Sequence, residues 1–166
     1  MWNRIEEYFR PYPGRWKVVV HLIRQGLAVR GGSIRSGEME IPAISVARAC
    51  GVDRRVVAAT IGSIEGDEFI KSVFEDLEPT LFLAKSGPKM GYGVLEITVL
   101  DPSAPGIVHK VTSEIAGRGI SIRQVVADDP RFYDPPMLTI ITEEPLPGDL
   151  LRTIKEIEGV DQLIIR

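Results

Sequence analysis

The segment Asp101–Gly106, Asp-Pro-Ser-Ala-Pro-Gly, carries residue types that suit the binding of a small charged molecule. An apolar helical pattern follows it, so the segment stands at the expected N-terminus of a helix. Free backbone N–H groups at such an end attract a carboxylate, and Gly106 allows a close approach to the backbone. Pro105 suits the first helical position, where no N–H donor is needed. The Asp101 carboxylate can accept hydrogen bonds from an ammonium group.

The elements that must position this segment follow from the apolar periodicity of the C-terminal part of the chain. The predicted order is a strand over 94–100, a helix that begins near Ile107 and stops at Gly117, strands over 120–126 and 137–142, a short helix near 147–157, and a strand over 160–165. Ile107, Val108, Val111 and Ile115 share one face of the first helix. This order is the split βαβ arrangement of a ferredoxin-like α+β sandwich.

Pro105-Gly106, the apolar helix and Gly119-Ile120-Ser121-Ile122 together resemble the ACT domain, a regulatory module that senses amino acids and similar metabolites. The resemblance covers about 70 residues. It implies a homodimer formed through this domain, and a pocket between the loop after the first strand and the second strand of a neighbouring subunit. The implied ligand-binding residues are Asp101, Ser103, Pro105, Gly106, Ile107 and Val108, facing Ile120, Ser121, Ile122 and Arg123.

One departure from the family pattern leaves an alternative open for this domain. Amino-acid binders of the ACT family often carry asparagines where Ser103 and Ser121 stand, so this chain offers fewer polar contacts. The alternative is a ferredoxin-like domain without a ligand, in which Gly106 and Gly119 only shape turns.

The N-terminal part contains a segment, 41–61, that resembles a helix-turn-helix. Gly51 permits a sharp turn, Val52 would fill the angle between the helices, and Asp53 is a suitable N-cap for the second helix. In such motifs the start of the second helix enters the major groove of DNA, and Arg54 and Arg55 occupy that place.

The sequence before this motif predicts helices over 2–10 and from Trp16 to Gly26, then a β-hairpin around the glycine-rich segment 31–37. Such a hairpin would act as a wing. Its Arg30 and Arg35 would add contacts to DNA phosphates, or would only serve solubility.

The outward face of the second helix of the motif favours a different partner. Ala58, Ala59 and Gly62 have no groups for contacts to base edges, and they would pack closely against another protein. Residues 1–64 hold 10 Lys and Arg against 5 Asp and Glu, whereas residues 65–166 hold 10 against 18. A basic first part favours a polyanionic partner or is simply a solvated surface.

The composition break between the two parts places a helix-turn-helix-like domain at 1–78, a linker at 79–92 and an ACT domain at 93–166. Nearly end to end, the chain resembles the predicted archaeal regulators of amino acid metabolism, which join these two domains. The stretches that carry this resemblance are 51–57, 95–98, 119–124, 127–130 and 138–143.

No pattern of residues indicates catalysis. His21 and His109 lack a neighbouring relay or metal-ligand spacing, and the single cysteine, Cys50, fits a helix core. The carboxylates of the loop 128–136 suit turn caps better than a cation site. We therefore expect no enzyme activity, cofactor or metal. We also expect a cytoplasmic protein without a membrane segment, because no apolar run approaches the roughly 20 residues that a spanning helix needs.

These patterns predict a regulatory protein that binds an amino acid through its ACT domain and acts on DNA through its N-terminal domain. The alternative is a regulatory subunit that docks on a metabolic enzyme without binding DNA.

Overall fold

The computed structural model describes residues 2–166 and divides the chain into unit 1, up to Leu81, and unit 2, from Phe82 to Arg166. The boundary falls inside the predicted linker, 79–92, and assigns most of that segment to unit 2. This segment belongs to unit 2 because its Ala84 is buried against Val94 and Ile141 of the unit 2 sheet.

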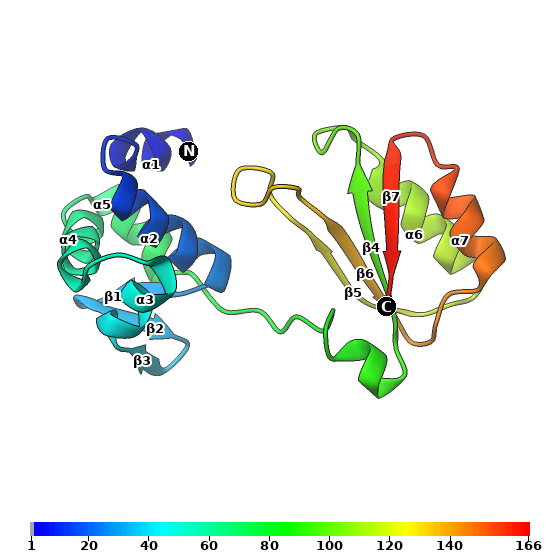
Figure 1. Ribbon diagram of the computed structural model, residues 1–166, viewed down its shortest axis with the longest axis horizontal. Helices are drawn as coiled ribbons and strands as arrows, with labels where there is room; N and C mark the ends of the chain where they lie inside the picture. Colours follow the sequence, from blue (N-terminus) through cyan, green and yellow to red (C-terminus); the bar gives the residue numbers. More distant parts are fainter. Residues whose placement is uncertain (1) are drawn as a thin grey trace. The chain divides into compact units, whose positions relative to one another are not determined.

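Unit 1 combines helices with a small antiparallel sheet (Figure 1). Its elements in chain order are α1 (Trp2–Phe9), α2 (Pro13–Gln25), β1 (Ala28–Arg30), β2 (Ser33–Ser36), β3 (Met39–Ile41), α3 (Ala43–Cys50), α4 (Arg54–Glu65) and α5 (Glu68–Glu75). Phe9, Leu22, Ile34, Val57 and Phe74 are fully or almost fully buried in one apolar core.

The glycine-rich segment differs from the single hairpin that the sequence predicts. It contains the central strand of a three-stranded sheet, β1-β2-β3, with tight turns on both sides. Gly31 and Gly32 adopt positive φ in the first turn, and Gly37 does so in the second. Ile34 between them is buried in the core, and its burial fixes the strand.

The segment predicted as a helix-turn-helix forms α3 and α4, joined by Gly51, Val52 and Asp53. Gly51 ends α3 in the left-handed conformation, with φ +64°. The Asp53 carboxylate accepts a hydrogen bond from the Arg55 N–H at 2.7 Å and so caps α4. Val52 packs against the core of unit 1.

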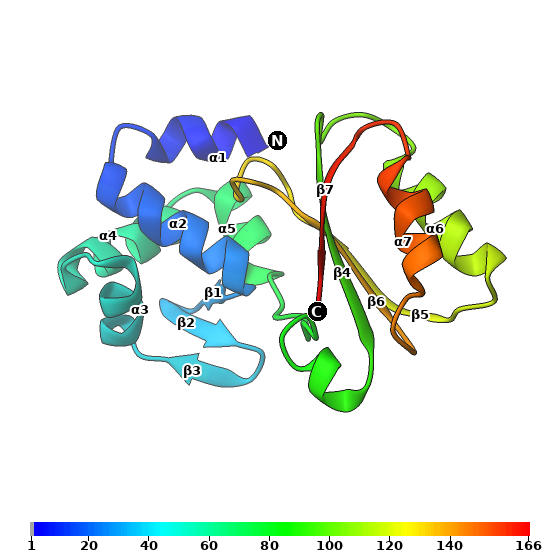
Figure 2. The same ribbon diagram turned by 45° about the vertical axis from the view of Figure 1, so that its right-hand side comes forward.

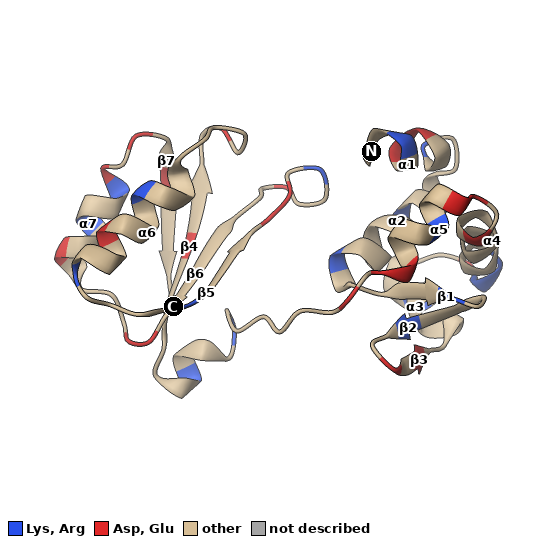
Figure 3. Ribbon diagram, turned by 180° about the vertical axis from the view of Figure 1, so that it is seen from behind, with Lys and Arg blue, Asp and Glu red and all other residues tan. Residues whose placement is uncertain are grey.

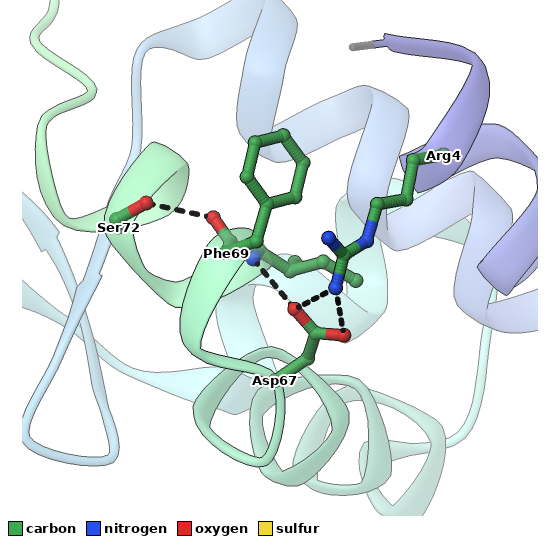
Figure 4. Close-up of polar contacts among 5 residues, drawn as sticks. Arg4, Asp67, Phe69 and Ser72 are labelled. Atoms are coloured by element: carbon green, nitrogen blue, oxygen red, sulfur yellow. Dashed lines mark hydrogen bonds and ion pairs between the residues drawn. The ribbon is translucent and has the colours of Figure 1, made fainter.

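An ion pair fastens α1 to the start of α5 (Figure 4). The Asp67 carboxylate accepts the Ile70 N–H at 3.0 Å, and the Arg4 guanidinium donates to it at 2.9 Å. Arg4 also lies 4.7 Å from the centroid of the Phe69 ring. The bond from Ile70 and, after it, the bond from Arg4 lower the pKa of Asp67, so this carboxylate stays ionised at neutral pH.

Unit 2 has the ferredoxin-like βαββαβ order that the sequence predicts. Its elements are the 3-10 helix η1 (Gly87–Met90), then β4 (Gly93–Val99), α6 (Ile107–Gly117), β5 (Ile122–Ala127), β6 (Leu138–Thr142), α7 (Gly148–Lys155) and β7 (Val160–Ile165). The sheet order is β5-β6-β4-β7, and all neighbouring strands are antiparallel. Both α6 and α7 cover one face of this sheet, as Figure 2 shows.

The C-terminal end of α2 closes tightly against the chain that leaves α5. Gly26 caps α2 with φ +59°, and a Cβ atom there would lie 2.2 Å from the backbone oxygen of Glu78. Gly51 has a similar φ, but a Cβ atom there would meet nothing within 4 Å.

We predict that Gly26→Ala destabilises unit 1 by about 3 kcal/mol, because left-handed strain and a backbone clash add. Gly51→Ala, the matched control, should cost only the strain, about 1 kcal/mol. Urea unfolding followed by tryptophan fluorescence measures both, since Trp2 and Trp16 lie in unit 1. Equal losses for the two variants would show that the close approach at Gly26 is absent.

Candidate functional site

A pocket of about 130 Å³ opens in unit 2 beside the N-terminal end of α6. Three segments line it: the loop after β4, the start of α6, and the two ends of the β5–β6 connection. The lining residues are Val99, Asp101, Pro102, Ala104, Gly106, Ile107, Val108, Ala127, Asp128, Pro136, Met137 and Leu138.

The register of the sheet brings these segments together. Leu138 at the start of β6 pairs with Ile97 of β4 on one side and with Ala127 of β5 on the other. The loops that follow β4 and β5 therefore leave the sheet at the same end of its strands. Both meet the start of α6, which lies on the helix-covered face.

The start of α6 provides backbone donors. Gly106 is the N-cap, with φ +94° and no side-chain cap, and its carbonyl accepts the first helical bond, from the Lys110 N–H, at 2.9 Å. The N–H groups of Ile107 and Val108 therefore have no acceptor within the helix. Together with the helix dipole, such groups can attract an anion.

Two sequence predictions at this helix are wrong. Pro105 does not occupy the first helical position, because α6 begins at Ile107 after Gly106 has turned the chain with a positive φ. Val108 does not share the buried face of Ile107, Val111 and Ile115, because it is 44% exposed. The exposed Val108 instead forms part of the pocket lining.

Two carboxylates stand at the pocket, and hydrogen bonds hold both. An oxygen of Asp101 accepts the Ser103 N–H at 2.8 Å, which shapes the loop before α6. An oxygen of Asp128 accepts the Met137 N–H at 3.2 Å, across the base of the β5–β6 connection. The pocket thus combines helix N–H donors, two acidic groups and apolar walls.

The residues predicted for the first half of the site divide into two groups. Asp101, Gly106, Ile107 and Val108 line the pocket, whereas Ser103 and Pro105 do not. Sequence reasoning missed the wall from the β5–β6 connection, which contains Ala127, Asp128 and Leu138.

The predicted second half of the site lies at the opposite end of the sheet. Ile122 pairs with Thr142, and Thr142 pairs with Gly93 at the start of β4. Ile120 is buried in the core, Ser121 is exposed, and the Arg123 guanidinium donates to Glu143 at 2.8 Å. Within one chain these residues do not line the pocket.

The arginines predicted to contact DNA are in two different situations. Arg30 Nε donates to the backbone oxygen of Glu75 at 2.7 Å, and Arg35 pairs with Glu38. Arg54 and Arg55 are exposed at the start of α4, and the ion pairs among residues 2–166 include neither of them.

Residues 2–166 contain no group of three or more His, Cys, Asp or Glu side chains placed to hold a metal ion. Within the same residues, no helix has the length and apolar character that crossing a membrane requires.

Comparison with known proteins gives weak similarity only. No protein-family model and no curated protein matches the chain. Among solved structures, the ACT domain of the GTP pyrophosphokinase of Chlorobium tepidum is 16% identical, with 45% of this chain and 95% of that chain covered and a TM-score of 0.32. MtbAldR is 13% identical, with 78% and 83% covered and a TM-score of 0.27. These values define neither fold nor function, and the fold rests on the strand order described above.

We predict that Ala127→Leu abolishes amino-acid binding in this pocket, because the larger side chain fills the space beside Leu138. Gly106 is a poorer place for such a test, because its positive φ makes any substitution there strained. Ala116→Leu, on an exposed position of α6 outside the pocket lining, is the matched control and should bind normally. Calorimetric titration measures the affinities, and equal affinities for both variants would place the ligand elsewhere.

Proposed function

We propose that the protein is a non-catalytic, cytoplasmic regulator of the ACT type. Unit 2 binds a small metabolite, an α-amino acid, and this binding controls unit 1, which acts on DNA. The observation that carries the proposal is the pocket at the start of α6, where uncapped N–H groups lie beside Asp101 and Asp128.

The chemistry of the pocket matches the two charges of an α-amino acid. The carboxylate would accept hydrogen bonds from the N–H groups of Ile107 and Val108. The ammonium would donate to Asp101 or Asp128. The volume of about 130 Å³ is well below the 300–1,000 Å³ that is common for ligand pockets, so a small side chain is favoured.

A homodimer is part of the proposal. The edge strands of the unit 2 sheet, β5 and β7, leave one side of their backbone unpaired. Leu100 and Val108, beside the pocket, are 74% and 44% exposed. A second copy would cover these groups and would supply Ile120, Ser121, Ile122 and Arg123 to the site. Light scattering at micromolar concentration should give the mass of a dimer, and a monomer would exclude this assembly.

The role of unit 1 in the proposal rests on α3, the turn at Gly51–Asp53 and α4. This arrangement supports the helix-turn-helix that we propose, with Arg54 and Arg55 exposed where the second helix would enter the major groove. Arg30 and Arg35 are not among the DNA contacts that we propose, because both already donate to backbone oxygens of unit 1.

We predict that Arg54→Gln with Arg55→Gln weakens binding to duplex DNA at least tenfold at low salt, because two phosphate or base contacts are lost. The matched control is Arg30→Gln with Arg35→Gln, which removes the same charge and should weaken binding much less. Fluorescence anisotropy with a labelled duplex over a range of salt concentrations measures both. Equal effects of the two double variants would mean that only net charge matters.

The alternative is a regulatory subunit that docks on a metabolic enzyme. One observation favours it, because Ala58 and Gly62 are exposed on α4 and offer a close-packing surface without base-reading groups. A wild-type chain that shows no salt-dependent retention on DNA, but captures a metabolic enzyme only when the amino acid is present, would support this alternative.

A further inference from the structure

The lining of the unit 2 pocket offers few kinds of side chain besides its two carboxylates. Among the described residues that form it, none is a Ser, Thr, Asn, Gln or His, none is a Lys or Arg, and none is aromatic. Apart from Asp101, Asp128 and the backbone at Gly106, the lining is apolar. The pocket thus has groups for the two charges of a zwitterion, but no further side chain that could hydrogen-bond a polar group of the ligand.

The apolar part of this lining continues the core of unit 2. Ile107 and Leu138 belong to that core and are 8% and 6% exposed. Close packing holds Ile107 in place, because a Cβ atom on Gly159 would lie 2.9 Å from its Cδ1 atom. Val108 and Ala127, also in the lining, leave apolar surface exposed. An aliphatic ligand side chain in this place would cover that surface and extend the core, which is favourable.

The two carboxylates have different surroundings. Figure 3 shows acidic residues in the loop after β4 and at the base of the β5–β6 connection, the segments that contain Asp101 and Asp128. Asp128 is half-buried, accepts the Met137 N–H across the base of the connection and makes a further interaction within the chain. Asp101 is exposed, and the bond that it accepts from the Ser103 N–H is local to its own loop. Asp101 is therefore the better placed of the two to accept a hydrogen bond from a ligand.

We propose that the ligand of this pocket is a small aliphatic α-amino acid, no larger than valine. This inference rests on the proposed function of unit 2 and adds the chemical class of the ligand side chain. Asp101 accepts hydrogen bonds from the ammonium group, and the aliphatic side chain packs against Ile107 and Leu138. Asp128 is a positioning residue, because its bond to Met137 fixes the wall that the connection contributes.

The same lining disfavours the other classes of amino acid. An acidic side chain would meet two carboxylates, with no cation among the described lining residues to offset them. An aromatic side chain is too large for a volume of about 130 Å³. A hydroxyl group would leave water for an apolar wall, and such a pocket rejects the hydroxyl isostere of its ligand by about 100-fold.

The test is a calorimetric titration of the full chain with alanine, 2-aminobutyrate, valine, threonine, serine, aspartate and phenylalanine. Threonine has the shape of valine, and serine has that of 2-aminobutyrate, so each pair differs only by a hydroxyl group in place of a methyl group. We expect the tightest ligand to be aliphatic, and each aliphatic member of a pair to bind about 100-fold more tightly than its isostere. Aspartate and phenylalanine should show no binding up to about 10 mM.

Matched variants separate the roles of the two carboxylates. In Asp101→Asn and in Asp128→Asn, the side-chain oxygen can still accept the N–H bond that shapes its loop, so only the charge is lost. Asp101→Asn should weaken binding of the tightest amino acid at least tenfold, and Asp128→Asn less than threefold. Asp128→Ala, which also removes the bond to Met137, should weaken binding at least fivefold, so that Asp128→Asn acts as the conservative rescue.

The outcomes distinguish this inference from the proposed function. If serine, threonine, aspartate or phenylalanine binds as tightly as the aliphatic amino acids, the inferred side-chain class is wrong, while amino-acid binding by unit 2 stands. If Asp101→Asn and Asp128→Asn weaken binding equally, the assignment of the ammonium group to Asp101 is wrong. If no amino acid binds at about 10 mM, the inference and the proposed function both fail.

Discussion

The pairing of β6 between β4 and β5 is the constraint on which the candidate ligand site depends. Leu138 faces Ile97 and Ala127, and this register places the loop with Asp101 next to the connection with Asp128. A slip by one residue would turn every side chain of β6 to the other face and would remove Ile140 from the core beneath α6 and α7. The same contacts therefore determine both the core of unit 2 and the geometry of the pocket.

Unit 1 is built on one apolar core, and its charged side chains are unevenly placed around it. Acidic side chains gather around α5, where the Arg4–Asp67 pair and Lys71 fix α1 and α5 to their neighbours. Lys17 and Arg24 of α2 are exposed, and so are Arg54 and Arg55 at the start of α4.

Much of this organisation could be predicted from local patterns, and the failures have physical reasons. Alternating and helical apolar positions indicate the βαββαβ order, and Asp53 marks the start of α4. The strand at Ser33–Ser36 could not be predicted, because the glycines around it are typical of a loop. Its one strong signal is the burial of Ile34, which depends on contacts with distant parts of the core. Ala127 and Asp128 were missed because register is non-local. The order of elements did contain a signal for this wall. The helix between β4 and β5 makes these two strands run parallel, so both of their carboxyl ends lie at the same end of the sheet.

A thermal-unfolding screen of the full chain against the twenty amino acids tests most directly whether unit 2 binds an α-amino acid. We expect that one amino acid, or a few small ones, stabilises the protein by about 2.7 kcal/mol at about 100 times its dissociation constant. The stabilised transition should be that of unit 2, and Ala127→Leu should remove the effect. An unchanged transition with every amino acid at millimolar concentration would contradict the claim.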